Sequence, residues 1–497
     1  MARGGNGYGC FPRKLIFVEI WESLKFADMT IPELEEQLRQ RDARIKELEK
    51  EIEELKKLLV EKAKSKEAKP PPEATNYSVD RHERKQRKNR RRKKSTGRKP
   101  NELKRDLATR TVDLYWYGAV RKKCVLRREQ FVWRLIDGNA AYVHYRIFDE
   151  PDSRDLPPID GVRNGKSEYG IEILIALAYL VYWTGISIDK ACGILTFFTG
   201  LELSKSQADS LLSQLVVDWQ IEYDAIAELV AAAAILYVDE TGWKVGKRSC
   251  YTWIFSTLST VLFKCGVGRG KAVLTDVLGE HFDGIGVTDD YSAYQSQFSE
   301  HQLCWAHFLR KAIALSLRNP DNRQYRRFVK SLFAIYYDAV RFSCDRRLSA
   351  GRQVKVNKLQ SRIRMICRRY GEPMDDATPA DDAKFVRLQN ELVDHVGNLF
   401  VFVLHPEVEA TNNISERQAR SEAMARKATR TSKTASGAKR RGIIMSVLAS
   451  LSKRLEPFTL GSVLTEINRW FETGKSIFRE ELATIQAATA IPSNAPP

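Results

Sequence analysis

Cysteine is scarce in this sequence, and its spacing excludes one class of protein. Eight cysteines are spread over 497 residues, and no two of them form a CxxC pair. A small secreted domain held together by disulfides would carry a dense cysteine framework. We therefore expect reduced thiols and a cytoplasmic protein. The eight are Cys10, Cys124, Cys192, Cys250, Cys265, Cys304, Cys344 and Cys367.

Long apolar segments are lacking as well. The longest apolar run lies near Ile173–Trp183 and is too short to span a bilayer. The N-terminal residues also lack the pattern of a secretory signal peptide. The sequence therefore predicts a protein that is neither secreted nor inserted in a membrane.

Acidic residues are too few to balance the basic ones. Lys and Arg number 81 against 63 Asp and Glu, which gives a net charge of +18. Such a surplus favours a polyanionic partner, nucleic acid first and an anionic membrane surface second. The length of the chain suggests two to four domains.

The first 66 residues divide into two segments. Residues 1–28 fit no domain pattern, so we expect a disordered or non-native extension, with Met29 as the natural start. In residues 29–66, apolar side chains recur at three- and four-residue steps between charged ones, which predicts a coiled coil and self-association. A single solvated helix is the alternative. The repeat consists of Leu34, Leu38, Ile45, Leu48, Ile52, Leu55 and Leu59, with Arg41 in one of its positions.

Residues 67–101 form a basic linker. The prolines of KPPPEATNYS exclude a helix, and the dense like charges after them favour a disordered chain. Along DNA, such a segment would release counterions and bind phosphates without sequence preference. A merely solubilising tract is the alternative. The basic residues are Arg84, Lys85, Arg87, Lys88, Arg90, Arg91, Arg92, Lys93 and Lys94.

Residues 102–230 are expected to form a mainly helical DNA-binding domain, after an irregular or β-rich start around residues 124–148. YGIEILIALAYLVYW predicts a buried helix, and SIDKACGILTFFTG and SKSQADSLLSQLVVDWQ predict two more. Ser187 and Ser204 are the expected N-caps. Two helices joined by a short glycine-containing turn suit a helix-turn-helix unit, and an ordinary helical bundle fits equally well.

Acidic residues follow two buried strands further along the chain. In AAAAILYVDETGWKV, Asp239 shares a strand face with Ile235 and Tyr237. The next segments predict two antiparallel strands, a helix, and a strand ending at Asp289. This is the element order of a ribonuclease-H-like core, in which the first and fourth strands lie side by side. Asp239 and Asp289 should therefore meet, and a divalent cation such as Mg²⁺ or Mn²⁺ would relieve their repulsion.

Glu416 is the candidate for a third acid at this site. It lies near the start of a helix predicted from HPEVEATNNISERQAR. Asn413 and Glu416 also have the spacing of a capping box, in which Glu416 would only cap its own helix. The local sequence alone favours the cap.

Four blocks of sequence, taken in order, resemble one known family. YVDETGWKV, TDDYSAY, CWAHFLRK and ATNNISERQAR are similar to segments of the transposases of the insertion sequence 66 family. The likeness runs from about residue 34 to 450. It includes the coiled-coil start, the basic linker and the closing RKATRTSKTASGAKRRGIIMSVLASL.

The resemblance implies a DDE-type transposase whose catalytic, metal-binding triad is Asp239, Asp289 and Glu416. Two Mg²⁺ ions, with Mn²⁺ as an alternative, would serve cleavage of the transposon 3′ ends and their joining to target DNA. The family usually has a glycine where this chain has Asp290. That departure leaves open whether Asp289 or Asp290 is the second ligand.

The resemblance also implies a multidomain α/β fold with a mixed-sheet, ribonuclease-H-like core. The core is expected at residues 231–314 and 401–450. The 127 positions from Asp289 to Glu416 imply a helical insertion at 315–400. A C-terminal helix and a flexible tail are expected at 451–497.

The partners implied are double-stranded DNA at the transposon ends and at the target, and accessory proteins encoded by some elements. A multimer would bridge two ends in a bacterial cytoplasm, near the nucleoid. Phosphate contacts are expected from Arg269, Lys271, Arg417, Arg420, Arg426, Lys427, Arg430 and Lys433, although some of these charges would suit a solvated surface equally well.

Zinc is not expected in the segment between the basic linker and the helical domain. Family members often carry a cysteine-rich zinc-binding segment before the helical domain, but here that region holds only Cys124. Cys304 and His307 have C-x-x-H spacing, and two ligands do not make a zinc site. We expect a packed cysteine beside a buried histidine.

Two rival functions remain open from the sequence. One is a metal-dependent nuclease of the same fold. The other is an inactive DNA-binding or architectural protein whose acids are relics.

Overall fold

The structure is a computed structural model that describes residues 100–490, apart from 117, 152–155, 163–166, 346, 348–350 and 429. The predicted N-terminal extension, the coiled coil and the basic residues at positions 84–94 lie outside the described residues.

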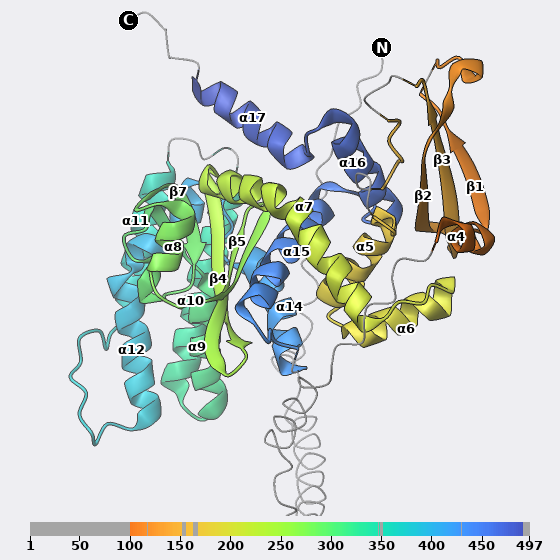
Figure 1. The fold of residues 1–497 in the computed structure, drawn as a ribbon. Coiled ribbons are helices and arrows are strands. Elements are labelled where there is room, and N and C mark those ends of the chain that lie inside the picture. The colour runs from red at the N-terminus through yellow and green to blue at the C-terminus, as the bar shows by residue number, and fades with distance from the viewer. Residues whose placement is uncertain are drawn as a thin grey trace, which may run out of the picture. The chain divides into compact units, whose positions relative to one another are not determined.

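A three-stranded sheet opens the described chain (Figure 1). Strands β2 (Val125–Ile136) and β3 (Asn139–Asp149) form an antiparallel hairpin, which confirms the expected β-rich start. Its turn has positive φ at Asp137 (50°) and Gly138 (78°), a conformation that an Asp-Gly pair adopts at little cost. The other elements here are α4 (Asn101–Leu107), β1 (Arg110–Leu114), parallel to β3, and the 3₁₀ turn η2 (Arg121–Lys123).

Three helices follow, as expected. They are α5 (Ile171–Ala178), continued by the π-helical η3 (Tyr179–Trp183), then α6 (Ile188–Thr199) and α7 (Lys205–Ala231). Ser187 caps α6, and Ser204 forms a capping box with Gln207 at the start of α7. The 27-residue α7 extends beyond this group and packs against the main sheet, where the Tyr223 hydroxyl donates to the carbonyl of Phe263 at 3.3 Å.

The main sheet has five strands in the order β6-β5-β4-β7-β8. The strands β4, β5 and β6 pair antiparallel, and β7 and β8 add in parallel on the other side of β4. Helix α8 (Ala272–Leu278) connects β6 to β7, and the 3₁₀ turn η4 (Ser292–Tyr294) precedes β8. The strands are β4 (Ile235–Val245), β5 (Arg248–Ser256), β6 (Val261–Val267), β7 (Phe282–Thr288) and β8 (Phe298–Leu303).

Strand β4 is longer than we expected from the sequence. Asp239 was predicted to close this strand, but β4 continues to Val245 because its hairpin with β5 extends to the pair Val245↔Arg248. Only the parallel pairing with β7 ends earlier, at Tyr237↔Val287. Asp239 therefore lies just beyond the end of the parallel pairing, although strand β4 itself continues for six more residues.

The two faces of the sheet belong to different hydrophobic clusters. Leu236 and Val238 pack in one cluster with helices α5–α7 and with α15 (Ala435–Arg454). Tyr237 and Val287 pack in the other, with the helices that follow β8. Alternation along the strand therefore directs Asp239 to the Tyr237 face, as the sequence predicted.

Helices account for the rest of the described chain. Only helices lie between β8 and α14 in the described residues of this stretch. The C-terminal segment has two helices, α16 and α17, where one was expected, because Gly474 ends α16 with φ of 71°. The helices are α9 (Trp305–Arg318), α10 (Arg323–Cys344), α11 (Arg352–Ile366), α12 (Ala380–Asp394), η5 (Val396–Leu399), α13 (Val401–Leu404), α14 (Asn413–Lys427), α15 (Ala435–Arg454), α16 (Leu460–Thr473) and α17 (Ile477–Ala490). None of the described helices is both long enough and apolar enough to cross a membrane.

Candidate active site

Asp239 and Asp289 occupy equivalent positions on two neighbouring parallel strands. Ile235 pairs with Ile285 and Tyr237 with Val287, a constant offset of 50 positions. The two aspartates share that offset, 289 − 239 = 50, and each follows the last pair by two residues. Because Tyr237 and Val287 belong to the same hydrophobic cluster, the two aspartates leave the sheet toward the same side.

Glu416 reaches this place from a different part of the chain. Its helix, α14, packs against β4 and β5, and the Ser415 hydroxyl donates to the carbonyl of Ile254 at 3.2 Å. The Asn412 side-chain amide donates to the carbonyl of Val238 at 2.7 Å, one residue before Asp239. The start of α14 is therefore tied directly to the strand that carries the first aspartate.

Cys304 links the end of β7, which precedes Asp289, to the start of α14. Its N–H donates to the carbonyl of Thr288, one residue before Asp289, at 2.8 Å. Its sulfur accepts from the backbone N–H of Asn412 at 3.2 Å. Asn412 and Cys304, both 1% exposed, thus join the backbones beside all three predicted acids.

Asp239 is affected by the other acids around it. The pKa of Asp239 is raised to about 8, first by burial and then by the negative charges of Glu240, Asp289 and Glu416. A bound cation would offset the free-energy cost of ionising Asp239 beside these other negative charges. Carboxylate oxygens are ligands that suit Mg²⁺ or Mn²⁺.

Glu240 and Asp290 face different partners. Glu240 accepts from Arg269 at 2.9 Å and from the hydroxyl of Tyr294, and burial raises its pKa. A carboxylate oxygen of Asp290 lies 3.3 Å from Nε2 of His395, the residue that separates α12 from η5. The alternation of β7 therefore favours Asp289 over Asp290 as the neighbour of Asp239.

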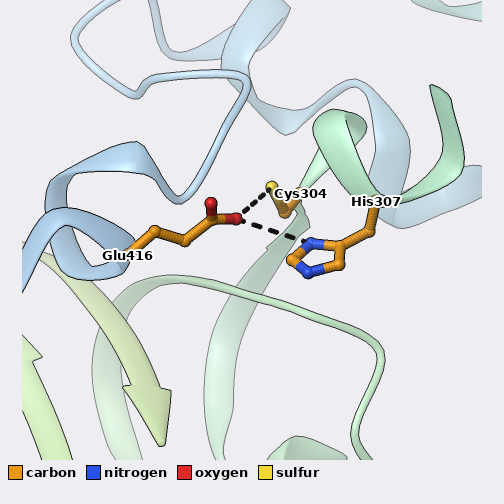
Figure 2. A group of neighbouring side chains, drawn as sticks. All are labelled: Cys304, His307 and Glu416. Carbon is orange, nitrogen blue, oxygen red and sulfur yellow. Dashed lines mark hydrogen bonds and ion pairs between the residues drawn. The ribbon is translucent and has the colours of Figure 1, made fainter. Parts of the chain in front are cut away.

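The carboxylate of Glu416 does not cap its own helix, which was the alternative left open by the sequence. Asn412, rather than Asn413, is the N-cap of α14, and its carbonyl accepts from the N–H of Glu416 at 2.9 Å. The side chain of Glu416 points to α9, where Arg310 donates to Oε1 at 2.9 Å. Cys304 Sγ and His307 Nδ1 each lie 3.8 Å from the same oxygen (Figure 2).

Cys304 is packed and buried, as we expected from the sequence. His307 differs from the expectation, because its side chain is 37% exposed. Burial and the nearby Arg310 lower the pKa of His307.

The predicted DNA-contacting residues fall into two groups. Arg269 and Arg426 are held by the protein: Arg269 pairs with Glu240 and lies 4.1 Å from the centre of the Tyr291 ring, and Arg426 donates to the carbonyl of Gly242 at 2.8 Å. The others are exposed. Lys271 precedes α8, Arg417, Arg420 and Lys427 lie on α14, and Arg430 and Lys433 follow α14.

Sequence reasoning missed Asn412 and Arg310. Asn412 stands beside the identical Asn413, and nothing local says which amide turns inward. Arg310 lies in the CWAHFLRK block, but its pairing with Glu416 spans 106 positions.

A comparison with known families identifies the family of this chain. The family model described as transposase IS66 family matches residues 166–440, more than half of the chain. No curated protein matches the chain. The chain therefore belongs to the IS66 family of transposases.

Proposed function

We propose that this chain is a DDE-type DNA transposase that cleaves transposon 3′ ends and joins them to target DNA. The observation that carries the proposal is the matched position of Asp239 and Asp289, with the helix of Glu416 hydrogen-bonded to the same edge of the sheet. The strand order and the helix between β6 and β7 support a ribonuclease-H-like core at residues 231–314 and 401–450. Residues 315–400 would be its helical insertion.

The residues at this edge fit a pair of Mg²⁺ ions, or Mn²⁺. The fit rests on three carboxylates from three elements and on the raised pKa of Asp239. When bound, such ions lower the pKa of the attacking water and stabilise the leaving oxygen. The pKa of Asp239 is raised by the charges of both Asp289 and Glu416, so we propose that Asp239 would help to hold both ions. Asp289 and Glu416 would each hold one.

The protein groups around the site have separate tasks in this proposal. Arg310 neutralises Glu416 in the absence of an ion and has to release it, which its 57% exposed side chain permits. The exposed basic residues that follow Glu416 suit the phosphate backbone of the bound DNA. Water or a DNA 3′-hydroxyl is the nucleophile, so a covalent intermediate on Ser or Tyr is not needed.

The other segments would bring the substrate. Residues 102–230 are proposed as the DNA-binding domain, with α6 and α7 as its possible helix-turn-helix. The coiled coil at 29–66 would associate copies of the chain, and the linker at 67–101 would contact phosphates. Accessory proteins from the same element would be further partners.

The proposal is tested by strand cleavage and joining on DNA that carries the ends of the element, with Mg²⁺ present. Glu416→Gln keeps the shape of the side chain but loses its charge, so cleavage should fall by about a hundredfold or more while end binding persists. Glu472→Gln, an exposed change on α16, is the matched control and should keep the wild-type rate. Full activity of Glu416→Gln would contradict the triad. Cleavage without joining would favour the nuclease, and DNA binding with neither reaction would favour the architectural protein.

A further inference from the structure

Cys304, His307 and Glu416 form a compact group of three different metal-ligating side chains. One ligand atom from each lies within 4.8 Å of the other two, and the carboxylate oxygen is 3.8 Å from both the sulfur and the ring nitrogen (Figure 2). In a tetrahedral zinc site, bond lengths of about 2.0–2.3 Å place neighbouring ligand atoms about 3.4–3.6 Å apart. The two distances to the carboxylate oxygen are therefore a few tenths of an ångström longer than in an occupied site, and the sulfur and the ring nitrogen lie within 4.8 Å of each other.

The donor atoms are also oriented for an ion. His307 Nδ1 is buried and has no hydrogen-bond partner among the described residues, which is unusual for a polar atom. The backbone N–H of Asn412 donates to the sulfur of Cys304 at 3.2 Å, which fixes the position of the sulfur beside Glu416. The two observations are independent of each other, since one concerns the ring and the other the sulfur.

Arg310 is the group that an ion has to displace. It donates to Glu416 Oε1 at 2.9 Å and lies 3.4 Å from Nε2 of His307. Its side chain is 57% exposed, so moving into solvent costs little. Glu416 also has a second oxygen that can keep Arg310 while Oε1 binds the ion.

We propose that Cys304, His307 and Glu416 bind a thiophilic divalent cation such as Zn²⁺. A thiolate, an imidazole and a carboxylate are the ligands that this class of ion prefers, whereas Mg²⁺ avoids sulfur. Three protein ligands leave a fourth position for water. Binding releases the thiol proton of Cys304 to solvent.

The site has a consequence that rests on the function proposed above. Glu416 belongs both to this group and to the acid triad. An ion held by Cys304 and His307 therefore takes Glu416 from Asp239 and Asp289. Zn²⁺ should inhibit strand cleavage in competition with Mg²⁺, through Glu416 alone.

The binding site is tested first, without any activity measurement. Co²⁺ titrated into the reduced full-length protein should give the visible bands of a tetrahedral ion and a near-ultraviolet thiolate-to-cobalt band. Cys304→Ser should abolish the thiolate band, and His307→Gln should weaken Co²⁺ binding by about tenfold or more. Cys367→Ser, another buried cysteine, is the matched control and should leave the spectrum unchanged. A thiolate band that survives in Cys304→Ser, or no band in a folded wild type, would overturn the proposal.

The competition is tested by cleavage at fixed Mg²⁺ with rising Zn²⁺, each variant being compared with its own zinc-free rate. The half-inhibitory Zn²⁺ concentration should rise about tenfold in His307→Gln, and added Mg²⁺ should restore the wild-type rate. Equal inhibition of His307→Gln and wild type would overturn the competition. If no variant cleaves DNA but the cobalt spectrum behaves as expected, the proposed function fails and the metal site stands.

Discussion

The side-chain amide of Asn412 donates to the backbone carbonyl of Val238 at 2.7 Å, which ties the start of α14 to the strand residue before Asp239. The two residues are 174 positions apart in the sequence. The contact therefore helps to hold the helix that carries Glu416 against the strand that carries Asp239.

Replacing Asn412 should weaken both the fold and the reaction. Asn412→Ala leaves the buried carbonyl of Val238 without a donor, which costs about 1–3 kcal/mol in the free energy of unfolding. The cleavage rate should fall more than DNA-end binding, because Glu416 loses its position. Urea unfolding and single-turnover cleavage measure the two effects. Asn413→Ala changes an exposed neighbour and should stay within about 0.5 kcal/mol. Equal effects of the two variants would contradict the role of Asn412.

A buried ion pair holds α14 against α15. Arg441 donates twice to Glu422, at 2.8 Å each, and the two side chains are 7% and 0% exposed. Arg441→Met leaves the charge of Glu422 buried and unpaired, so unfolding should become easier by about 3–5 kcal/mol. Adding Glu422→Leu should recover most of that loss.

The matched control for the ion pair is Arg341→Met. Arg341 pairs with Asp338 on the surface and is 72% exposed, so its loss should cost under about 1 kcal/mol. Chemical denaturation of the single and double variants separates the two cases. A loss for Arg441→Met as small as that for Arg341→Met would show that the buried pair contributes little.

Acid should destabilise the protein through His301. Burial, followed by the charge of His395, lowers the pKa of His301 to about 4, and its ring lies 2.8 Å from the Thr288 hydroxyl. The unfolded chain takes up this proton near pH 6.5. Between those two values the unfolded state binds more protons, so the free energy of unfolding falls as the pH decreases from about 6.5 to 4.

His301→Gln should therefore lose less stability than the wild type between pH 7 and pH 5, measured by urea midpoints. His281→Gln, at an exposed histidine, should follow the wild-type pH profile. If His301→Gln and wild type lose stability in parallel, His301 does not cause the acid sensitivity.

The exposed basic residues that follow Glu416 should contribute to DNA affinity through charge alone. Changing Arg417, Arg420, Lys427 and Arg430 to Gln should weaken binding of any DNA sequence. The slope of log affinity against log salt should decrease by about 0.9 for each phosphate that the variant no longer neutralises. Fluorescence anisotropy at several salt concentrations measures this slope. An unchanged slope would mean that these charges form only a solvated surface.

Local sequence patterns predicted most elements of the core. Alternation along β4 placed Asp239 on the face of Tyr237, and the serines at 187 and 204 marked the starts of two helices. These predictions succeed because side-chain alternation and N-caps depend on residues only a few positions apart. Where local patterns compete, they fail: the N-x-x-E spacing favoured a cap, and Glu416 pairs with Arg310 instead.

The sequence by itself determined the family, the order of the elements from β4 to β7, and the offset of 50 positions that aligns Asp239 with Asp289. Only the tertiary structure decided which amide of the Asn412–Asn413 pair turns inward, and which groups surround Glu416. It also brought a third ligand to Cys304 and His307, which the C-x-x-H spacing alone does not supply. The physical reason is the distance along the chain. These contacts join residues more than a hundred positions apart, and packing of α9 and α14 on the sheet selects them rather than any preference of the local backbone.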